Sequence, residues 1–185
     1  WAGFDLIFTA HNHSLDQGVN GIDSTLAALK AAGLAATGTR QTINEKPYYL
    51  TEINGLKLAF FSYTTLTNGL APPPDQKWVL NTFNDHKIAW EILQLRKAGV
   101  DGIIMALHSG EEYQRYPSPA DQKLYRRLLA LGVDLILGSH VHVIRPLERV
   151  VLKDPFSNRL KTGLLAYSLG NFLSNQRWRY SDCGL

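Results

Sequence analysis

The sequence predicts an α/β fold with a mixed β-sheet or two packed sheets. Short apolar runs of strand length alternate with segments in which apolar residues recur at helical spacing. Two of the runs, Gly102–Leu107 and Asp134–Leu137, are apolar at nearly every position, as is typical of strands buried on both faces of a sheet. Antiparallel pairs interrupt the alternation, so a regular doubly wound sheet is not expected.

The first strand is expected at Phe4–Ala10, where nearly every residue is apolar, aromatic or β-branched. A helix is expected at Val19–Ala32. Its apolar residues Ile22, Leu26 and Leu29 are spaced by four and three positions, so they fall on one face.

A β-hairpin is expected in the next segment. The runs Tyr48–Ile53 and Leu56–Tyr63 flank Asn54-Gly55, a dipeptide that favours a two-residue hairpin turn. Leu70–Asp75 contains three consecutive prolines, so we expect an exposed loop there.

The second half continues with helices and strands. Asn84–Ala98 has the apolar spacing of a helix, and another helix is expected after Ser118-Pro119, with the serine as cap and the proline in the first turn. Leu147–Leu152 and Leu160–Ser168 are expected to pair as antiparallel strands.

The composition is that of a soluble globular chain, and a length of 185 residues fits one domain spanning residues 1–185. No apolar run reaches the roughly 18 residues that a membrane span needs, so no direct membrane span is expected in this chain. The single cysteine, Cys183, excludes an internal disulfide.

The net charge is +3, and basic residues are concentrated in the second half of the chain. These residues form either a solvated surface or a rim that attracts an anionic substrate or polymer. The segment Arg177–Tyr180 alternates arginine with aromatic residues, as some single-strand nucleic-acid binders do. One tetrapeptide is too little for that function, and no nucleic-acid partner is expected.

Four short polar clusters stand at or near the ends of apolar runs: His11–His13, His108–Tyr113, Gly138–His142 and Ser168–Phe172. Five of the six histidines are in the first three clusters. Open α/β folds place their chemistry at the rim where strands end, so the clusters are expected to meet in one site.

His140 and His142 are candidate metal ligands. If the backbone is extended, alternate side chains share a face, and both rings reach one site. Neutral imidazole suits zinc, manganese, iron and nickel. His108 is a further candidate ligand, with a hydrogen-bonded rim residue as the alternative. Glu112 either orients a ligating ring or is a carboxylate at a helix start.

Asn12 offers a metal an amide oxygen without adding charge, and the adjacent His13 can give a proton to a leaving group. The alternative is a simple turn. We expect His11 to pack beside the site as a rim residue. Asn171 either lines the pocket or belongs to a structural turn near Gly170. No GxSxG, GxxxxGK[ST] or GxGxxG motif is present, which disfavours the corresponding hydrolase, phosphate-loop and dinucleotide sites.

Taken together and in order, the segments HNHSLDQG, HSGEEY, GSHVHVIRPLE and AYSLGNF resemble the poly-gamma-glutamate capsule biosynthesis family, often called CapA-like. That family belongs to the calcineurin-like metallophosphatase superfamily. The resemblance implies metallophosphatase-like mixed β-sheets sandwiched between helices. It also implies two divalent metal ions (manganese, zinc or iron) at the strand ends.

The resemblance also implies a role for each matching residue. Asn12, His108 and His140 match ligands of the second metal, and His142 matches a ligand of the first. His13 matches the family's proton donor.

The sequence departs from the family pattern at His11, Ser109 and Ser139, where asparagine, tryptophan and histidine are usual. None of these positions is a superfamily ligand. The superfamily's two aspartate motifs precede the asparagine motif, and Asp5, at the beginning of its strand, is poorly placed to substitute for them. We therefore expect an incomplete fragment of the domain, with its N-terminal part missing, that holds at most one ion weakly.

Three functions are compatible with the resemblance. The first is metal-dependent hydrolysis of a phosphoester or related anionic cell-envelope substrate. The alternative is a non-enzymatic module that binds or assembles an anionic capsule polymer, and hydrolysis of the polymer's amide bonds is a third possibility. A polymer-synthase membrane complex is the implied partner. The implied location is the cell envelope, at the extracellular face of a bacterial membrane, with no anchor present in this chain.

Overall fold

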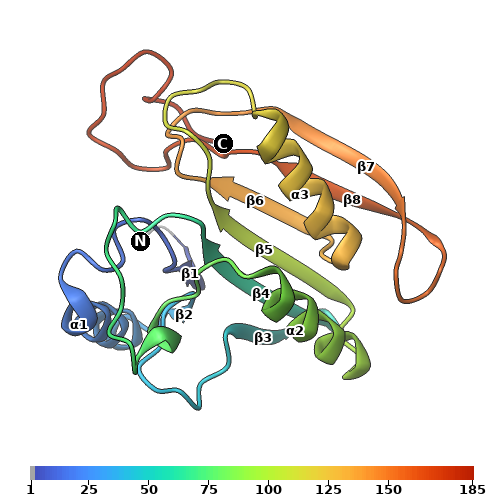
Figure 1. The fold of residues 1–185 in the computed structure, drawn as a ribbon, viewed down its shortest axis with the longest axis horizontal. Coiled ribbons are helices and arrows are strands. Elements are labelled where there is room, and N and C mark those ends of the chain that lie inside the picture. Colours follow the sequence, from blue (N-terminus) through green and yellow to red (C-terminus); the bar gives the residue numbers. More distant parts are fainter. Residues whose placement is uncertain (1–2) are drawn as a thin grey trace.

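The computed structural model describes residues 3–185, which form two β-sheets and three α-helices (Figure 1). The strands are β1 (Leu6–Phe8), β2 (Ala35–Thr37), β3 (Tyr48–Ile53), β4 (Leu56–Thr64), β5 (Gly102–His108), β6 (Leu135–Ser139), β7 (Leu147–Lys153) and β8 (Leu160–Ala166). The helices are α1 (Gly18–Ala31), α2 (Asp85–Lys97), α3 (Pro119–Leu131) and a short 3-10 helix η1 (Lys77–Val79).

The larger sheet has six strands in the order β3-β4-β5-β6-β8-β7. The central pairs β4–β5, β5–β6 and β6–β8 are parallel, whereas the outer pairs β3–β4 and β7–β8 are antiparallel hairpins. The β3–β4 hairpin turns at Asn54 and Gly55, whose φ angles of 52° and 80° are those that a tight two-residue turn requires. The predicted mixed α/β architecture is confirmed.

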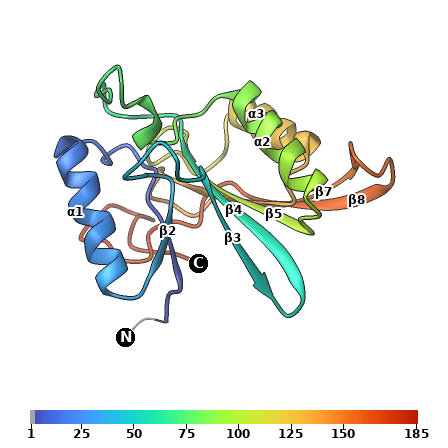
Figure 2. The ribbon, with the colours of Figure 1, turned by 90° about the horizontal axis from the view of Figure 1, so that it is seen from below.

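The smaller sheet pairs β1 with β2 in parallel, and Figure 2 shows α1 beside it. Two predictions differ from the structure here. The strand predicted over Phe4–Ala10 is shorter, and β2 was not predicted. β1 and β2 are both three residues long and pair with each other over their whole length.

The main core lies between the six-stranded sheet and the pair α2 and α3, which cover the same face of it (Figure 2). Helix α2 contributes Ile88, Ile92 and Leu95, all buried. Strands β5 and β6 contribute Ile103 and Ile136 from beneath. The central strands under these helices are parallel, so the loops that follow them leave the sheet at one edge.

The opposite face of the sheet is covered only in part, because residues of β1 lie against it near Tyr49, Phe60 and Leu137 (Figure 2). Leu147, Val151 and Leu164 lie on this face and are largely exposed. A cavity of about 410 Å³ lies beside Leu135 and Leu137. Within residues 3–185, no helix is long and apolar enough to cross a membrane.

Candidate functional site

His108 lies at the centre of the polar clusters, at the end of β5. Its Nε2 is 2.9 Å from Asn12 Oδ1, and its Nδ1 is 2.9 Å from the hydroxyl of Ser139 on β6. Burial, together with nearby histidines, lowers the pKa of His108 to about 3. The ring is therefore neutral at physiological pH, as a metal-ligating imidazole must be.

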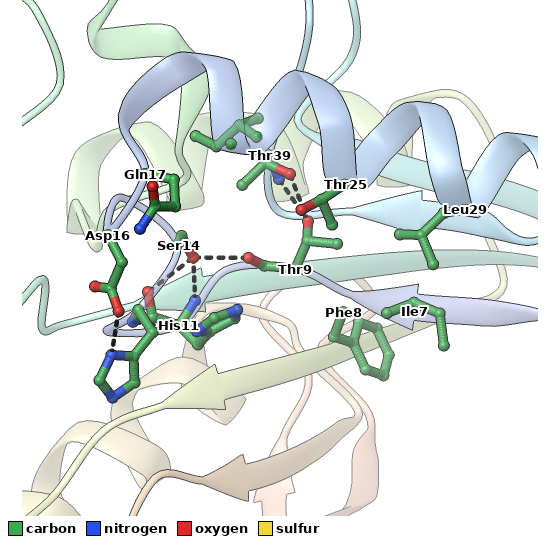
Figure 3. A pocket seen from close by; sticks show the side chains of 13 residues that line it. Ile7, Phe8, Thr9, His11, Ser14, Asp16, Gln17, Thr25, Leu29 and Thr39 are labelled. Atoms are coloured by element: carbon green, nitrogen blue, oxygen red, sulfur yellow. Dashed lines mark hydrogen bonds and ion pairs between the residues drawn. The ribbon is translucent and has the colours of Figure 1, made fainter.

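Asn12 reaches His108 from the loop that follows β1. Its side chain is buried, and Nδ2 donates a hydrogen bond of 3.2 Å to Asn68 Oδ1, which turns the amide oxygen towards His108. Ser14 shapes this loop, because its hydroxyl donates to the Thr9 carbonyl at 2.8 Å and accepts from the His11 amide at 2.9 Å (Figure 3).

His140 and His142 follow β6 in a turn, not in an extended segment. Their φ angles are 97° and 62°, in the left-handed region that non-glycine residues rarely adopt. The expectation that both rings share one face of extended backbone is therefore wrong, and the turn instead sets their centroids 6.3 Å apart. The ring of His140 lies 4.8 Å from that of His108, and His140 Nδ1 is buried without a hydrogen-bond partner among residues 3–185.

His142 has its own set of neighbours. Its Nδ1 is 2.9 Å from Asn171 Oδ1, and its Nε2 is 3.8 Å from Glu112 Oε1. The ring of Tyr113 stacks on it at 5.8 Å between centroids. Glu112 lies in a loop well before α3, so the interpretation as a helix-start carboxylate is wrong.

His13 lies at the exposed side of the site. Its Nδ1 is 2.8 Å from Asp16 Oδ2 (Figure 3). His11 lies between His13 and His108, with ring centroids 6.5 Å and 5.9 Å away, and burial lowers its pKa. A cavity of about 240 Å³ adjoins His11 and His13 and extends between β1 and α1. The eight residues singled out from the sequence thus lie in one region.

Sequence reasoning missed four side chains of this region: Asp16, Asn68, Tyr113 and Ser139. Asp16 follows His13 by three residues, and a single turn of the backbone brings residues at this spacing together. The contact between Asp16 and His13 was therefore predictable from the sequence. In the sequence, Ser139 is recognisable only as a departure from the family pattern. No local pattern in the sequence marks Asn68 as part of the site, because its partner Asn12 is 56 residues away.

The donor atoms permit a test of whether a divalent metal fits. Among residues 3–185, no group of three or more His, Cys, Asp or Glu side chains is arranged to hold an ion. Asn12 Oδ1, His108 Nε2 and the unpartnered His140 Nδ1 nevertheless form a neutral set of amide oxygen and imidazole nitrogen, which suits manganese, zinc or iron. The residues fit one such ion in chemistry, without a bridging carboxylate.

The sequence matches the family described as "Bacterial capsule synthesis protein PGA_cap" over residues 1–176. The chain belongs to this family. It is 30% identical to the capsule biosynthesis protein CapA of Bacillus anthracis, covering 100% of this chain and 44% of that protein. It is 28% identical to the PGA biosynthesis protein CapA of Bacillus subtilis, covering 95% and 44%. The chain thus spans less than half the length of these relatives.

The fold is similar to those of solved nucleotidases. The NAD nucleotidase of Haemophilus influenzae superposes with a TM-score of 0.60 at 17% identity, over 90% of this chain and 31% of that one. A putative 5'-nucleotidase from Staphylococcus aureus gives a TM-score of 0.52 at 14% identity, over 97% and 41%. These matches confirm the expected metallophosphatase-like fold.

Proposed function

We propose that this chain carries the metal-binding and acid–base residues of a hydrolase that acts on a phosphoester or related anionic cell-envelope substrate during capsule (poly-gamma-glutamate) biosynthesis. The observation that carries the proposal is the grouping of three side chains. Asn12 Oδ1 lies 2.9 Å from His108 Nε2, the ring of His140 lies 4.8 Å from that of His108, and His140 Nδ1 is buried with no hydrogen-bond partner among residues 3–185. Membership of the capsule synthesis family supports the biological setting.

The three neutral donors have the role of ligands in this proposal. Asn68 aims the Asn12 oxygen, and Ser139 holds the His108 ring, so these two donors are oriented before an ion arrives. A divalent ion held there supplies Lewis acidity and neutralises the charge of a phosphoryl group.

His13 is the proposed proton donor. When Asp16 accepts a hydrogen bond from Nδ1, the other ring nitrogen, Nε2, is the one that can carry a proton to a leaving group. The pair lies on the exposed side of the site, where a large substrate can reach it. Asp16 is therefore a positioning residue for His13.

The partners and location follow from the same proposal. An anionic polymer or phosphoester is the substrate, and a polymer-synthase complex at the membrane is the assembly partner. Relatives described as polyglutamine synthesis accessory proteins in Mycobacterium tuberculosis support an accessory role. The proposed location is the cell envelope, at the extracellular face.

The test measures binding of Mn²⁺, and then of inorganic phosphate, to this chain by calorimetry. We expect one Mn²⁺ per chain and phosphate binding that depends on Mn²⁺. His140→Ala should abolish Mn²⁺ binding, whereas His86→Ala, at an exposed position on α2, should leave it unchanged. Phosphate binding that is equally tight without Mn²⁺, or Mn²⁺ binding that survives His140→Ala, would contradict the proposal.

A second candidate is a non-enzymatic module that binds or assembles an anionic capsule polymer. It is favoured by the lack of a carboxylate-rich metal cluster in the described part of the chain. Hydrolysis by a two-metal centre needs bridging carboxylates, whereas polymer binding does not. For this reason phosphodiester turnover by this chain alone is expected near background.

A further inference from the structure

Nε2 of His142 and Oε1 of Glu112 are two acceptor atoms that lie close together. His142 Nδ1 donates to Asn171 Oδ1 at 2.9 Å, so the neutral ring presents the lone pair of Nε2. The nearest carboxylate oxygen, Glu112 Oε1, lies 3.8 Å from that nitrogen. Hydrogen bonds of this type measure about 2.7–3.2 Å, so Glu112 does not orient the ring by a direct hydrogen bond.

The ring of His142 does not need a second orienting group. Asn171 is held in turn, because its Nδ2 donates to the Ser181 carbonyl at 2.8 Å. Tyr113 covers one face of the ring by stacking. With the ring fixed by these two residues, the position of Glu112 calls for another explanation.

The loop that carries Glu112 is held close to His142. Tyr113 has a φ of 64°, and its amide donates to the Val141 carbonyl at 2.8 Å, which ties the loop to the turn between the two histidines. A non-glycine residue in the left-handed region is strained, so surrounding contacts must hold Tyr113 there.

Arg145 supplies such contacts from behind the loop. This buried guanidinium donates to the carbonyls of Gln114 at 2.7 Å and Glu111 at 3.2 Å, and to the Asp121 carboxylate at 3.1 Å. The loop can lie this close to Arg145 because residue 110 is a glycine. A Cβ there would lie 2.9 Å from Arg145 Nη1. The loop is therefore fastened on both sides of Glu112.

We infer that Glu112 is a direct carboxylate ligand of a divalent cation that it shares with His142, an inference that rests on the proposed metal-dependent function. Two ligand atoms that each lie about 2.0–2.2 Å from one ion are separated by roughly 3–4 Å, which matches the distance observed between Oε1 and Nε2. Glu112 thus provides the anionic donor that Asn12, His108 and His140 lack.

The experiment compares Glu112→Gln with Glu111→Gln in calorimetric titrations of this chain with Mn²⁺. Glutamine keeps an acceptor oxygen but loses the charge, so a residue that only orients a neighbour would be little affected. We expect Glu112→Gln to weaken Mn²⁺ binding by about 100-fold or more, beyond the usual effect of residues that merely support ligands. Glu111 is adjacent and exposed, and its substitution should change the affinity less than about threefold.

Infrared difference spectra provide a second readout. Addition of Mn²⁺ should shift a carboxylate stretching band in the wild type and in Glu111→Gln, and this shift should be absent in Glu112→Gln. Mn²⁺ binding that is equal in both variants overturns the role of Glu112 but leaves the proposed function intact. A chain that binds no Mn²⁺ at all overturns both, and an affinity loss without any carboxylate shift identifies a simple ion pair between Glu112 and His142.

Discussion

His108 is kept neutral by its surroundings. Burial is the largest cause of its lowered pKa, and the neighbouring His140, His11, His142 and His13 act in the same direction. A protonated ring at this position would lack solvation and would repel its neighbours. The same burial that prepares the residue as a ligand therefore makes the folded state sensitive to acid.

We expect acid to destabilise the metal-free chain through His108. Between the ordinary histidine pKa of 6.5 and the folded pKa of about 3, the unfolded chain binds a proton that the folded chain does not, so stability is full above pH 6.5 and falls below it. His108→Gln should reduce the loss of unfolding free energy between pH 7.5 and pH 5 by about 1–2 kcal/mol. Urea denaturation in a chelator measures this difference. His86→Gln is the control, and equal losses in His108→Gln and the wild type would refute the assignment.

Helix α3 shows how an element positions the site. Ser118 accepts from the Asp121 amide at 3.1 Å, and the Asp121 carboxylate accepts from the Ser118 amide at 3.0 Å, which forms a capping box before Pro119. Asp121 also accepts from Arg145, the residue that holds the loop of Glu112. The Asp121 carboxylate thus connects the start of α3, through Arg145, to the loop that carries Glu112.

We expect Ser118→Ala to lower the unfolding free energy by about 1 kcal/mol, because the hydroxyl satisfies a helix N-terminal amide. Urea denaturation at neutral pH measures the effect. Ser24→Ala, at an exposed position inside α1, should be neutral or slightly stabilising, because alanine is the better helix former. A comparable loss in both variants would show that the cap contributes nothing specific.

Elements with strong periodicity were predictable, and short elements were not. The stripe Ile88, Ile92 and Leu95 that indicated α2 is buried against the sheet, and the Asn54-Gly55 turn joins β3 to β4 as expected. Strand β2 has no such pattern in three residues. Strand β2 forms by pairing with β1, and this pairing joins segments that are distant in the sequence.

Over the whole molecule, many of the basic residues of the second half are paired. Arg126 contacts Glu148, Arg127 contacts Asp85, and Lys161 contacts Asp134, and these pairs leave less free charge than the sequence indicates. Arg115 and Arg179 instead lie over the ring of Tyr180, at 4.1 Å and 4.7 Å from its centroid. The contact of Arg115 joins the loop after β5 to the segment that Asn171 anchors.

If an anionic polymer binds at these arginines, its affinity should fall steeply with salt, since exposed attraction is screened over about 10 Å at 0.1 M. We expect Arg115→Gln to weaken binding of poly-gamma-glutamate at low salt by about threefold to tenfold. Arg127→Gln, which removes an arginine already paired with Asp85, is the matched control. Titrations at low and high salt measure the effect, and a flat affinity, or none at either salt, would identify a solvated surface.

The amino-acid sequence alone is enough to predict the α/β class, the turn at Asn54-Gly55, the family, and the clusters that hold the candidate ligands. These depend on residue type and spacing within short segments. Three features of the site depend on the folded chain: His140 and His142 stand in a left-handed turn, Asn68 aims Asn12, and burial keeps His108 neutral. The physical reason is separation along the chain. The contact between Asn12 and His108 joins residues 96 positions apart, and no local pattern specifies such a contact.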